Sequence, residues 1–203
     1  MAAFFPRLAS LAALLLASAA LGAPGPRASL PISVEADSSD FDYKNGVLVF
    51  KRIRVTQGDA RVEADLATAT GLEFQNSQWR FEGNVRIAVE GGFLTSDVAK
   101  VRFQNNEIAS AEVTGQPATF AQQRGDQRAE GSAGRIDYDL ESGRVRLTEG
   151  ARLSDGRNEI TGSTLVYSVA DERIVAEAGA QGGEPVRITI NPQSPPGQDP
   201  PRP

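Results

Sequence analysis

The sequence predicts an all-β fold made of stacked antiparallel hairpin layers, and three observations support this prediction. Apolar and polar residues alternate along most of the chain, which is typical of strands with one buried and one solvent-facing side. Pro117 is the only proline between residues 32 and 184, so almost all of this stretch can donate hydrogen bonds within a sheet. A strand-turn-strand pattern also recurs along the chain.

Candidate strands follow one another from residue 32 to residue 190. Their apolar residues recur at every second position: Ile32, Val34 and Ala36; Val47 and Val49; Ile53 and Val55; Trp79 and Phe81; Val85, Ile87 and Val89; Ile136, Tyr138 and Leu140; Val145 and Leu147; Val186, Ile188 and Ile190. Turn residues separate them at about the spacing of hairpins: Asn45-Gly46, Gly58-Asp59, Gly91-Gly92, Asn105-Asn106, Ser142-Gly143, Asp155-Gly156 and Gly182-Gly183. No segment shows a helical stripe of apolar residues, so we expect short antiparallel strands throughout.

The strand-turn-strand pattern is an internal repeat. Residues 54–65 match residues 86–97 after a shift of 32, and a further shift of 66 leads to residues 152–163. Such a unit cannot bury its apolar face alone and must stack on its neighbours. The repeat therefore predicts an elongated fold that is open at both ends.

Composition excludes several classes of protein. The chain has 203 residues, of which 21 are basic and 26 acidic, and it contains no cysteine and no histidine. Without thiols and imidazoles there is no disulfide framework, no zinc-finger pattern and no Ser-His-Asp triad. The formal net charge of -5 does not provide the basic face that nucleic-acid binding needs. We therefore expect no cofactor, no metal ion and no nucleic-acid partner.

The two ends of the chain differ from its body. Residues 1–23 have the features of a signal peptide, because a cation and an apolar run are followed by small residues, with cleavage after Ala20 or Ala23. The alternative is a retained membrane anchor, which needs about 20 apolar residues and so a longer run than this one. Residues 193–203 are rich in proline and are predicted to be a disordered tail.

Six motifs carry a family resemblance. They are residues 31–37 (Pro-Ile-Ser-Val-Glu-Ala-Asp), 55–58 (Val-Thr-Gln-Gly) leading to 62–65 (Val-Glu-Ala-Asp), 81–85 (Phe-Glu-Gly-Asn-Val), 115–120 (Gly-Gln-Pro-Ala-Thr-Phe), 130–131 (Glu-Gly) and 136–140 (Ile-Asp-Tyr-Asp-Leu). In this order they resemble the OstA-like family of lipopolysaccharide-transport proteins, and the last three resemble its periplasmic bridge members of the LptA type. The resemblance covers residues 31–192, which we take as one OstA-like β-jellyroll domain.

The resemblance implies an open, V-shaped β-jellyroll whose apolar interior holds the acyl chains of lipopolysaccharide. It places five residues in contact with lipid: Ile32, Val34, Phe120, Tyr138 and Leu140. It also implies a location in the periplasm of a Gram-negative bacterium. The implied partners are lipid A acyl chains, an inner-membrane ABC exporter with its anchored periplasmic subunit, an outer-membrane assembly barrel protein, and further copies joined head to tail.

The sequence departs from the family pattern in two places. Lys51-Arg52 stands where the family usually has Gly-Asn, and two repeat copies instead of one precede residues 115–120. The extra copy leaves the matching of individual strands open between residues 50 and 105.

Other interpretations remain open at this point. With nine Phe, three Tyr and one Trp, the composition by itself favours a thin, packed sandwich over a lipid-filled groove. A polysaccharide-active β-solenoid enzyme could use acidic pairs such as Asp137 and Asp139, although we expect the recurrent Asp37, Asp65 and Asp97 to cap turns. A purely structural β-filament is the third alternative.

Unpaired strands at residues 32–36 and 186–190 would leave edges to which another copy can add.

Overall fold

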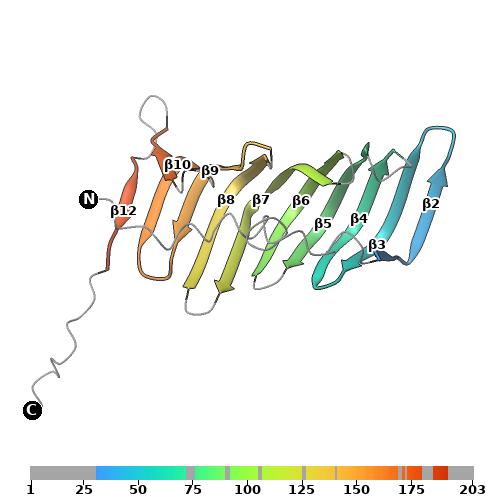
Figure 1. Ribbon diagram of the computed structural model, residues 1–203, viewed down its shortest axis with the longest axis horizontal. Coiled ribbons are helices and arrows are strands. Elements are labelled where there is room, and N and C mark those ends of the chain that lie inside the picture. The colour runs from blue at the N-terminus through green and yellow to red at the C-terminus, as the bar shows by residue number, and fades with distance from the viewer. Residues whose placement is uncertain are drawn as a thin grey trace, which may run out of the picture.

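A computed structural model describes most of the predicted domain. The described residues are 31–71, 76–89, 92–104, 107–124, 127–139, 141–168, 171, 173–179 and 185–191. They form one antiparallel sheet of twelve strands, in which the colour of Figure 1 runs steadily from blue at one end to red at the other. In this part of the chain no helix is long and apolar enough to cross a membrane. The signal peptide, Leu140 and the proline-rich tail lie outside the described residues.

The strands pair almost entirely in chain order. Their bounds are β1 (Ser33–Glu35), β2 (Ser38–Asp42), β3 (Val47–Gln57), β4 (Ala60–Thr70), β5 (Gln78–Val89), β6 (Gly92–Gln104), β7 (Glu107–Arg124), β8 (Gln127–Asp139), β9 (Arg144–Ser154), β10 (Glu159–Ser168), β11 (Arg173–Glu177) and β12 (Arg187–Thr189). From β3 to β10 each strand pairs with its neighbour in sequence. Two short strands complete each end: β1 and β2 both pair with β3, and β11 and β12 both pair with β10. The predicted all-β, open antiparallel fold is confirmed.

Short turns with specific chemistry connect the strands. Gly58 has a φ of 57° in the two-residue loop between β3 and β4, a conformation that glycine adopts without a Cβ penalty. Aspartates at the ends of strands accept hydrogen bonds from backbone N–H groups two and three residues further on. They are Asp42, Asp139 and Asp155, with N···O distances of 2.6 to 3.2 Å.

Each long strand is interrupted near its middle. The pairing shifts register between residues 63 and 66, 82 and 85, 95 and 98, 114 and 118, 132 and 135, and 162 and 164. Bulges of this kind bend a strand and increase its twist. Because they lie side by side on successive strands, the whole sheet bends along one line, which we call the fold line.

Residues with positive φ mark the fold line. Asn84 in β5 has a φ of 48° and Glu149 in β9 a φ of 65°. Arg52 in β3 has a φ of 50°, so the residue that departs from the family pattern adopts the same left-handed backbone as Asn84. The repeat detected in the sequence follows the same line, because residues 54, 86 and 152 come just after it on β3, β5 and β9. The repeat unit is therefore one bent hairpin, and the shift of 66 residues passes over the hairpin β7–β8.

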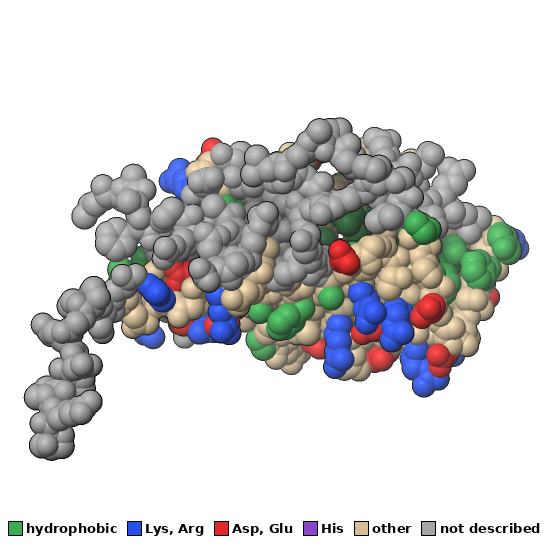
Figure 2. Space-filling model, turned by 60° about the horizontal axis from the view of Figure 1, so that its bottom comes forward, with side chains coloured by type: hydrophobic (Ala, Val, Ile, Leu, Met, Phe, Trp, Pro, Cys, Tyr) green, Lys and Arg blue, Asp and Glu red, His purple; other side chains and the backbone are tan. Residues whose placement is uncertain are grey.

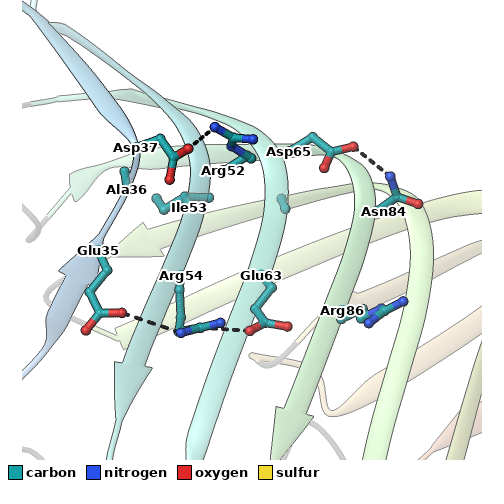
Figure 3. A pocket seen from close by; sticks show the side chains of 11 residues that line it. Glu35, Ala36, Asp37, Arg52, Ile53, Arg54, Glu63, Asp65, Asn84 and Arg86 are labelled. Atoms are coloured by element: carbon teal, nitrogen blue, oxygen red, sulfur yellow. Dashed lines mark hydrogen bonds and ion pairs between the residues drawn. The ribbon is translucent and has the colours of Figure 1, made fainter.

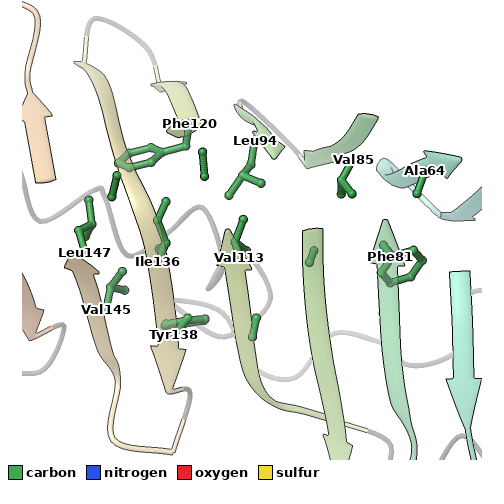
Figure 4. Packing of buried hydrophobic residues seen from close by; sticks show 14 of the residues in the cluster. Ala64, Phe81, Val85, Leu94, Val113, Phe120, Ile136, Tyr138, Val145 and Leu147 are labelled. Atoms are coloured by element: carbon green, nitrogen blue, oxygen red, sulfur yellow. The ribbon is translucent and has the colours of Figure 1, made fainter. Parts of the chain in front are cut away.

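The fold line divides the sheet into two halves whose inner side chains face each other (Figure 4). The aromatic half comprises β2, β11 and residues 47–51, 66–70, 78–82, 98–104, 107–114, 135–139, 144–148 and 164–168. The aliphatic half comprises β1, β12 and residues 53–57, 60–64, 85–89, 92–96, 118–124, 127–133, 151–154 and 159–162. Buried residues of both halves form a single hydrophobic cluster.

Candidate functional site

An uninterrupted row of directly paired residues crosses the aliphatic half from one end of the sheet to the other. Its members are Val34, Val55, Val62, Ile87, Leu94, Phe120, Gly131, Leu153, Ile160 and Ile188. Leu94 in the middle is buried, whereas Val34 and Ile188 at the two ends are 38% and 51% exposed. The row therefore makes an apolar track that is covered in the centre and reaches solvent at both ends.

A second row crosses the aromatic half in the same way. Its members are Phe41, Leu48, Ala69, Trp79, Val101, Ala111, Tyr138, Val145, Tyr167 and Ile174. Phe50 stacks on Trp79, and Trp79 on Phe81, with ring centroids 5.9 Å apart in each pair. Phe41 meets the edge of Phe50 at 5.8 Å. Aromatic rings from β2, β3 and β5 therefore pack in a row and form one wall of the interior near the N-terminal end of the sheet.

Small side chains line much of the interior between these aromatic residues. Among the described residues, nine of the 25 buried hydrophobic side chains are alanines. The ring of Phe120 lies against Gly131, where an added Cβ would come within 2.6 Å of the ring carbon Cζ. The interior surface is therefore apolar and has few large protruding side chains. A flexible apolar chain could contact it over a long stretch.

Among the described residues, the buried polar atoms of the interior that have no hydrogen-bond partner include the Oγ of Ser96, the Oε1 of Gln122 and the hydroxyl of Tyr138. Burial raises the pKa of Tyr138 well above its ordinary value of 10, so its hydroxyl stays protonated and remains a donor across the physiological pH range. Each of these atoms lacks the partner that buried polar groups normally have.

The outer face carries charges of both signs in alternation (Figure 2). Arg54 Nε donates to Glu63 Oε1 at 2.8 Å on the aliphatic half, and this hydrogen bond lowers the pKa of Glu63. On the aromatic half, Arg80 Nη2 donates to Glu82 Oε1 at 2.8 Å and lowers the pKa of Glu82. These pairs are partly exposed and contribute little to stability. The outer face is a solvated surface of cross-strand and same-strand ion pairs.

A polar pocket of about 530 Å³ lies at the fold line beside β1 (Figure 3). Within it Arg52 forms an ion pair with Asp37, and Asn84 Nδ2 donates to Asp65 Oδ2 at 2.7 Å. The expectation that Asp37 and Asp65 cap turns is therefore wrong, because their carboxylates bind side chains of neighbouring strands at the bend. The turn-capping role belongs to the aspartates at the strand ends.

The acidic pair considered for catalysis has structural partners. Arg135 donates to Asp137 through Nε at 2.8 Å and through Nη2 at 2.7 Å. Hydrogen bonds from the Ser142 side chain and from the backbone N–H groups of Ser142 and Glu141 lower the pKa of Asp139. Carboxylate pairs in glycosidases need one group with a raised pKa, whereas the pKa of Asp139 is shifted the other way and Asp137 is bound by Arg135. In the described ranges, no group of three or more acidic side chains is placed to hold a metal ion.

The structure places the predicted site residues at two locations. Phe120 and Tyr138 are both buried and lie on opposite halves of the hairpin β7–β8, so they share one interior (Figure 4). Ile32 and Val34 lie at the first end of the sheet and are exposed. Leu140 falls outside the described residues. Sequence reasoning missed Gln122, although its position two residues after Phe120 puts it on the same face of the strand.

Comparison with known proteins agrees with this architecture. The family model described as LptA/(LptD N-terminal domain) LPS transport protein matches residues 33–173. The lipopolysaccharide export system protein LptA of Haemophilus influenzae is 24% identical over 173 residues, which are 84% of this chain and 84% of that protein. The protein of the same name from Escherichia coli K12 is 27% identical over 171 residues, covering 80% of this chain and 76% of that protein.

A solved structure is also similar to this chain. It is the crystal structure of LptH from Pseudomonas aeruginosa, described as the LptA homologous periplasmic component of a lipopolysaccharide transport device. It is 22% identical, covers 80% of this chain and 96% of that chain, and has a TM-score of 0.47. The family model spans well over half of the sequence and confirms the resemblance to the OstA-like proteins of the LptA type. The chain therefore belongs to the LptA/LptD N-terminal domain family.

Proposed function

We propose that this chain is a periplasmic lipopolysaccharide-binding protein that carries lipopolysaccharide between the inner and outer membranes for outer-membrane assembly. The observation that carries the proposal is the apolar row from Val34 to Ile188, which runs the full length of the sheet and is exposed at both ends. Acyl chains between the two halves would be stabilised by about 0.8 kcal/mol for each CH₂ removed from water. This function needs no cofactor and no chemical reaction.

The membership of the family supports the same function, because its members are described as LPS transport proteins. Periplasmic localisation is supported by the predicted signal peptide at residues 1–23 and by the Pseudomonas aeruginosa protein described as periplasmic. Within this proposal, one end of the sheet receives lipid from an inner-membrane ABC exporter through its anchored periplasmic subunit. The other end delivers it to an outer-membrane assembly barrel protein, directly or through further copies.

The two ends of the sheet are suited to pairing with another β protein. β1 and β12 are short and leave their outer edges without a strand partner in the described chain. An added strand at such an edge would extend the apolar row without a break. Val34→Lys should therefore weaken head-to-tail self-association, because it places a charge in that row. Ser33→Lys is the matched control, since Ser33 faces the other side of the same strand. Sedimentation over a concentration series measures the difference, and equal association of the two variants would contradict end-to-end pairing through the row.

Lipopolysaccharide binding is the direct test of the proposed function. The protein purified from the periplasm should bind lipopolysaccharide by gel filtration, and its single tryptophan, Trp79, should report the binding because it lies in the interior. Ala111→Phe fills the space between Val101 and Tyr138 and should weaken binding about tenfold, or about 1.4 kcal/mol. Ser110→Phe adds the same ring to the outer face and should bind as the wild type does. Unchanged binding by a folded Ala111→Phe protein would show that lipid does not enter the interior.

A further inference from the structure

Two of the unpaired polar atoms lie on one hairpin. Tyr138 is 2% exposed and lies in the aromatic half of β8, directly opposite Ala111. Gln122 is 6% exposed and lies in the aliphatic half of β7, directly opposite Ala129. Both side chains project into the interior from the same pair of strands, one from each side of the fold line. The third atom, Ser96 Oγ, belongs to β6 and lies next to the fold line.

An unpaired buried polar atom is unfavourable in a folded protein. A buried donor or acceptor without a partner costs about 1–3 kcal/mol, whereas an apolar side chain of the same shape avoids that cost. Phenylalanine and methionine would fill the positions of Tyr138 and Gln122 with similar volume and without a polar atom. The residues directly opposite them across the hairpin, Ala111 and Ala129, carry no polar side-chain groups that could satisfy the two atoms.

The chemistry of the two atoms defines what would satisfy both. Gln122 Oε1 is an acceptor only, and the Tyr138 hydroxyl is a donor that can also accept. A ligand group that binds Gln122 must therefore donate a hydrogen bond, and one that binds Tyr138 must accept or donate one. A hydroxyl group does both, whereas the methylene groups of a plain alkyl chain do neither.

We propose that Tyr138 and Gln122 provide a polar subsite within the apolar interior, in which either side chain binds a hydroxyl group carried on the acyl chain of a lipid. This inference deepens the proposed function and rests on it, because the lipid must first enter between the two halves. The subsite gives the interior a preference for hydroxylated over plain acyl chains. It also favours positions of the chain along the sheet that bring the hydroxyl to the hairpin β7–β8.

The test compares fatty acids that differ only by a hydroxyl group. Tetradecanoate and its 3-hydroxy and 12-hydroxy derivatives are titrated into the whole protein, with Trp79 emission and displacement of a fluorescent fatty acid as readouts. The wild type should bind at least one hydroxylated acid about tenfold more tightly than tetradecanoate. The preference for a given hydroxylated acid should be lost in Tyr138→Phe or in Gln122→Met, according to which side chain binds its hydroxyl, and a variant with both substitutions should lose it entirely.

A control variant and a stability measurement accompany the titrations. Tyr167→Phe removes a hydroxyl from the same row two strands away, but that hydroxyl is not among the unpaired buried atoms, so the preference should persist. The midpoint of thermal unfolding of ligand-free Tyr138→Phe should equal or exceed that of the wild type, because the variant loses an unsatisfied buried group.

Each outcome separates the subsite from the function on which it rests. Equal affinities of the wild type for plain and hydroxylated acids would overturn the subsite and leave lipopolysaccharide binding intact. Binding of lipopolysaccharide but of none of the three acids would overturn it as well. Failure to bind lipopolysaccharide at micromolar concentration would overturn the proposed function and the subsite together.

Discussion

The two halves of the sheet follow the same alternation of apolar and polar residues but fill the interior differently. In the aromatic half, Phe50, Trp79 and Phe81 stack on one another and Tyr138 and Tyr167 continue the same wall. In the aliphatic half, Phe120 is the one buried aromatic residue within the described ranges, and alanine, valine and leucine surround it.

This difference separates a rigid wall of stacked rings from a wall of smaller side chains. Stacked rings bury large areas and hold one another in place, so the aromatic half is expected to carry more of the stability. The aliphatic half has small residues and, among the described residues, the unpaired polar atoms of Ser96 and Gln122. The outer faces of the two halves are alike, since both carry arginine–glutamate pairs. The two halves therefore differ in their inner side chains, which a ligand would contact, and resemble each other in the ion pairs of their outer faces.

Truncating one phenylalanine in each half tests the comparison most strongly. Phe81→Ala should reduce the free energy of unfolding by about 4 kcal/mol, because it leaves a cavity and removes the ring that stacks on Trp79. Phe120→Ala should cost about 3 kcal/mol, since its ring rests on Gly131 without a stacked partner. Urea unfolding of both variants measures the difference. A larger loss for Phe120→Ala would reverse the assignment of the rigid wall.

A glycine substitution tests how closely Phe120 packs in the aliphatic half. Gly131→Ala should lower stability by about 2 kcal/mol or more, because its Cβ would lie 2.7 Å from the Arg152 carbonyl oxygen as well as against the ring. Gly150→Ala is the matched control. It has a φ of 79° and free space around it, so only backbone strain of about 1 kcal/mol is expected. Thermal unfolding that is equal for the two variants would mean that the ring of Phe120 can move aside.

Adjacent substitutions in β6 compare the inner and outer faces of the aliphatic half. Ser96→Ala should stabilise the protein by about 1 kcal/mol, since it removes an unpaired buried hydroxyl. Thr95→Ala should destabilise it by a similar amount, because the Thr95 hydroxyl hydrogen bonds to that of Thr119 at 2.8 Å. Calorimetry of the two variants gives shifts of opposite sign. A loss of stability in Ser96→Ala would indicate that its hydroxyl has a partner in solution.

The smallest expected effect is a loss of stability at acidic pH to which both halves contribute. Hydrogen bonds from Arg54 and Arg80 lower the pKa of Glu63 and Glu82 below the ordinary value of 4.5 in the folded protein. Carboxylates of this kind stabilise the fold above pH 4.5, and the contribution is lost as the pH falls through their folded pKa values. Glu63→Gln and Glu82→Gln should therefore each flatten the fall in melting temperature between pH 5 and pH 3 slightly and by similar amounts. High salt should weaken the effect, and a strong effect confined to one half would contradict the likeness of the outer faces.

Much of the fold could be predicted from local pattern. The period of two locates strands, and pairs such as Asn45-Gly46 and Asp155-Gly156 locate turns because glycine adopts a positive φ there. The repeat from residue 54 to residue 86 anticipates the bent hairpin as the unit of the stack. These signals are local, so they can be read without knowledge of which strands pair.

Part of the candidate site could also be predicted from the sequence. The alternation puts Phe120 and Tyr138 on inward faces, and it puts Val34 on the apolar side of the first strand. The same alternation extends to Gln122, but a polar residue at an inward position was not recognised as a feature. Nothing local shows that the hydroxyl of Tyr138 lies among side chains that cannot pair with it.

Tertiary structure decided the bend, the two halves and the meeting of their residues. Whether Arg52 and Asn84 share a fold line depends on the register of strands that are distant in sequence, and register is set by pairing across the whole sheet. The bend then brings Phe120 and Tyr138 of one hairpin into the same interior from opposite sides. Alternation determines which face of a strand is apolar, whereas only the folded sheet determines what that face meets.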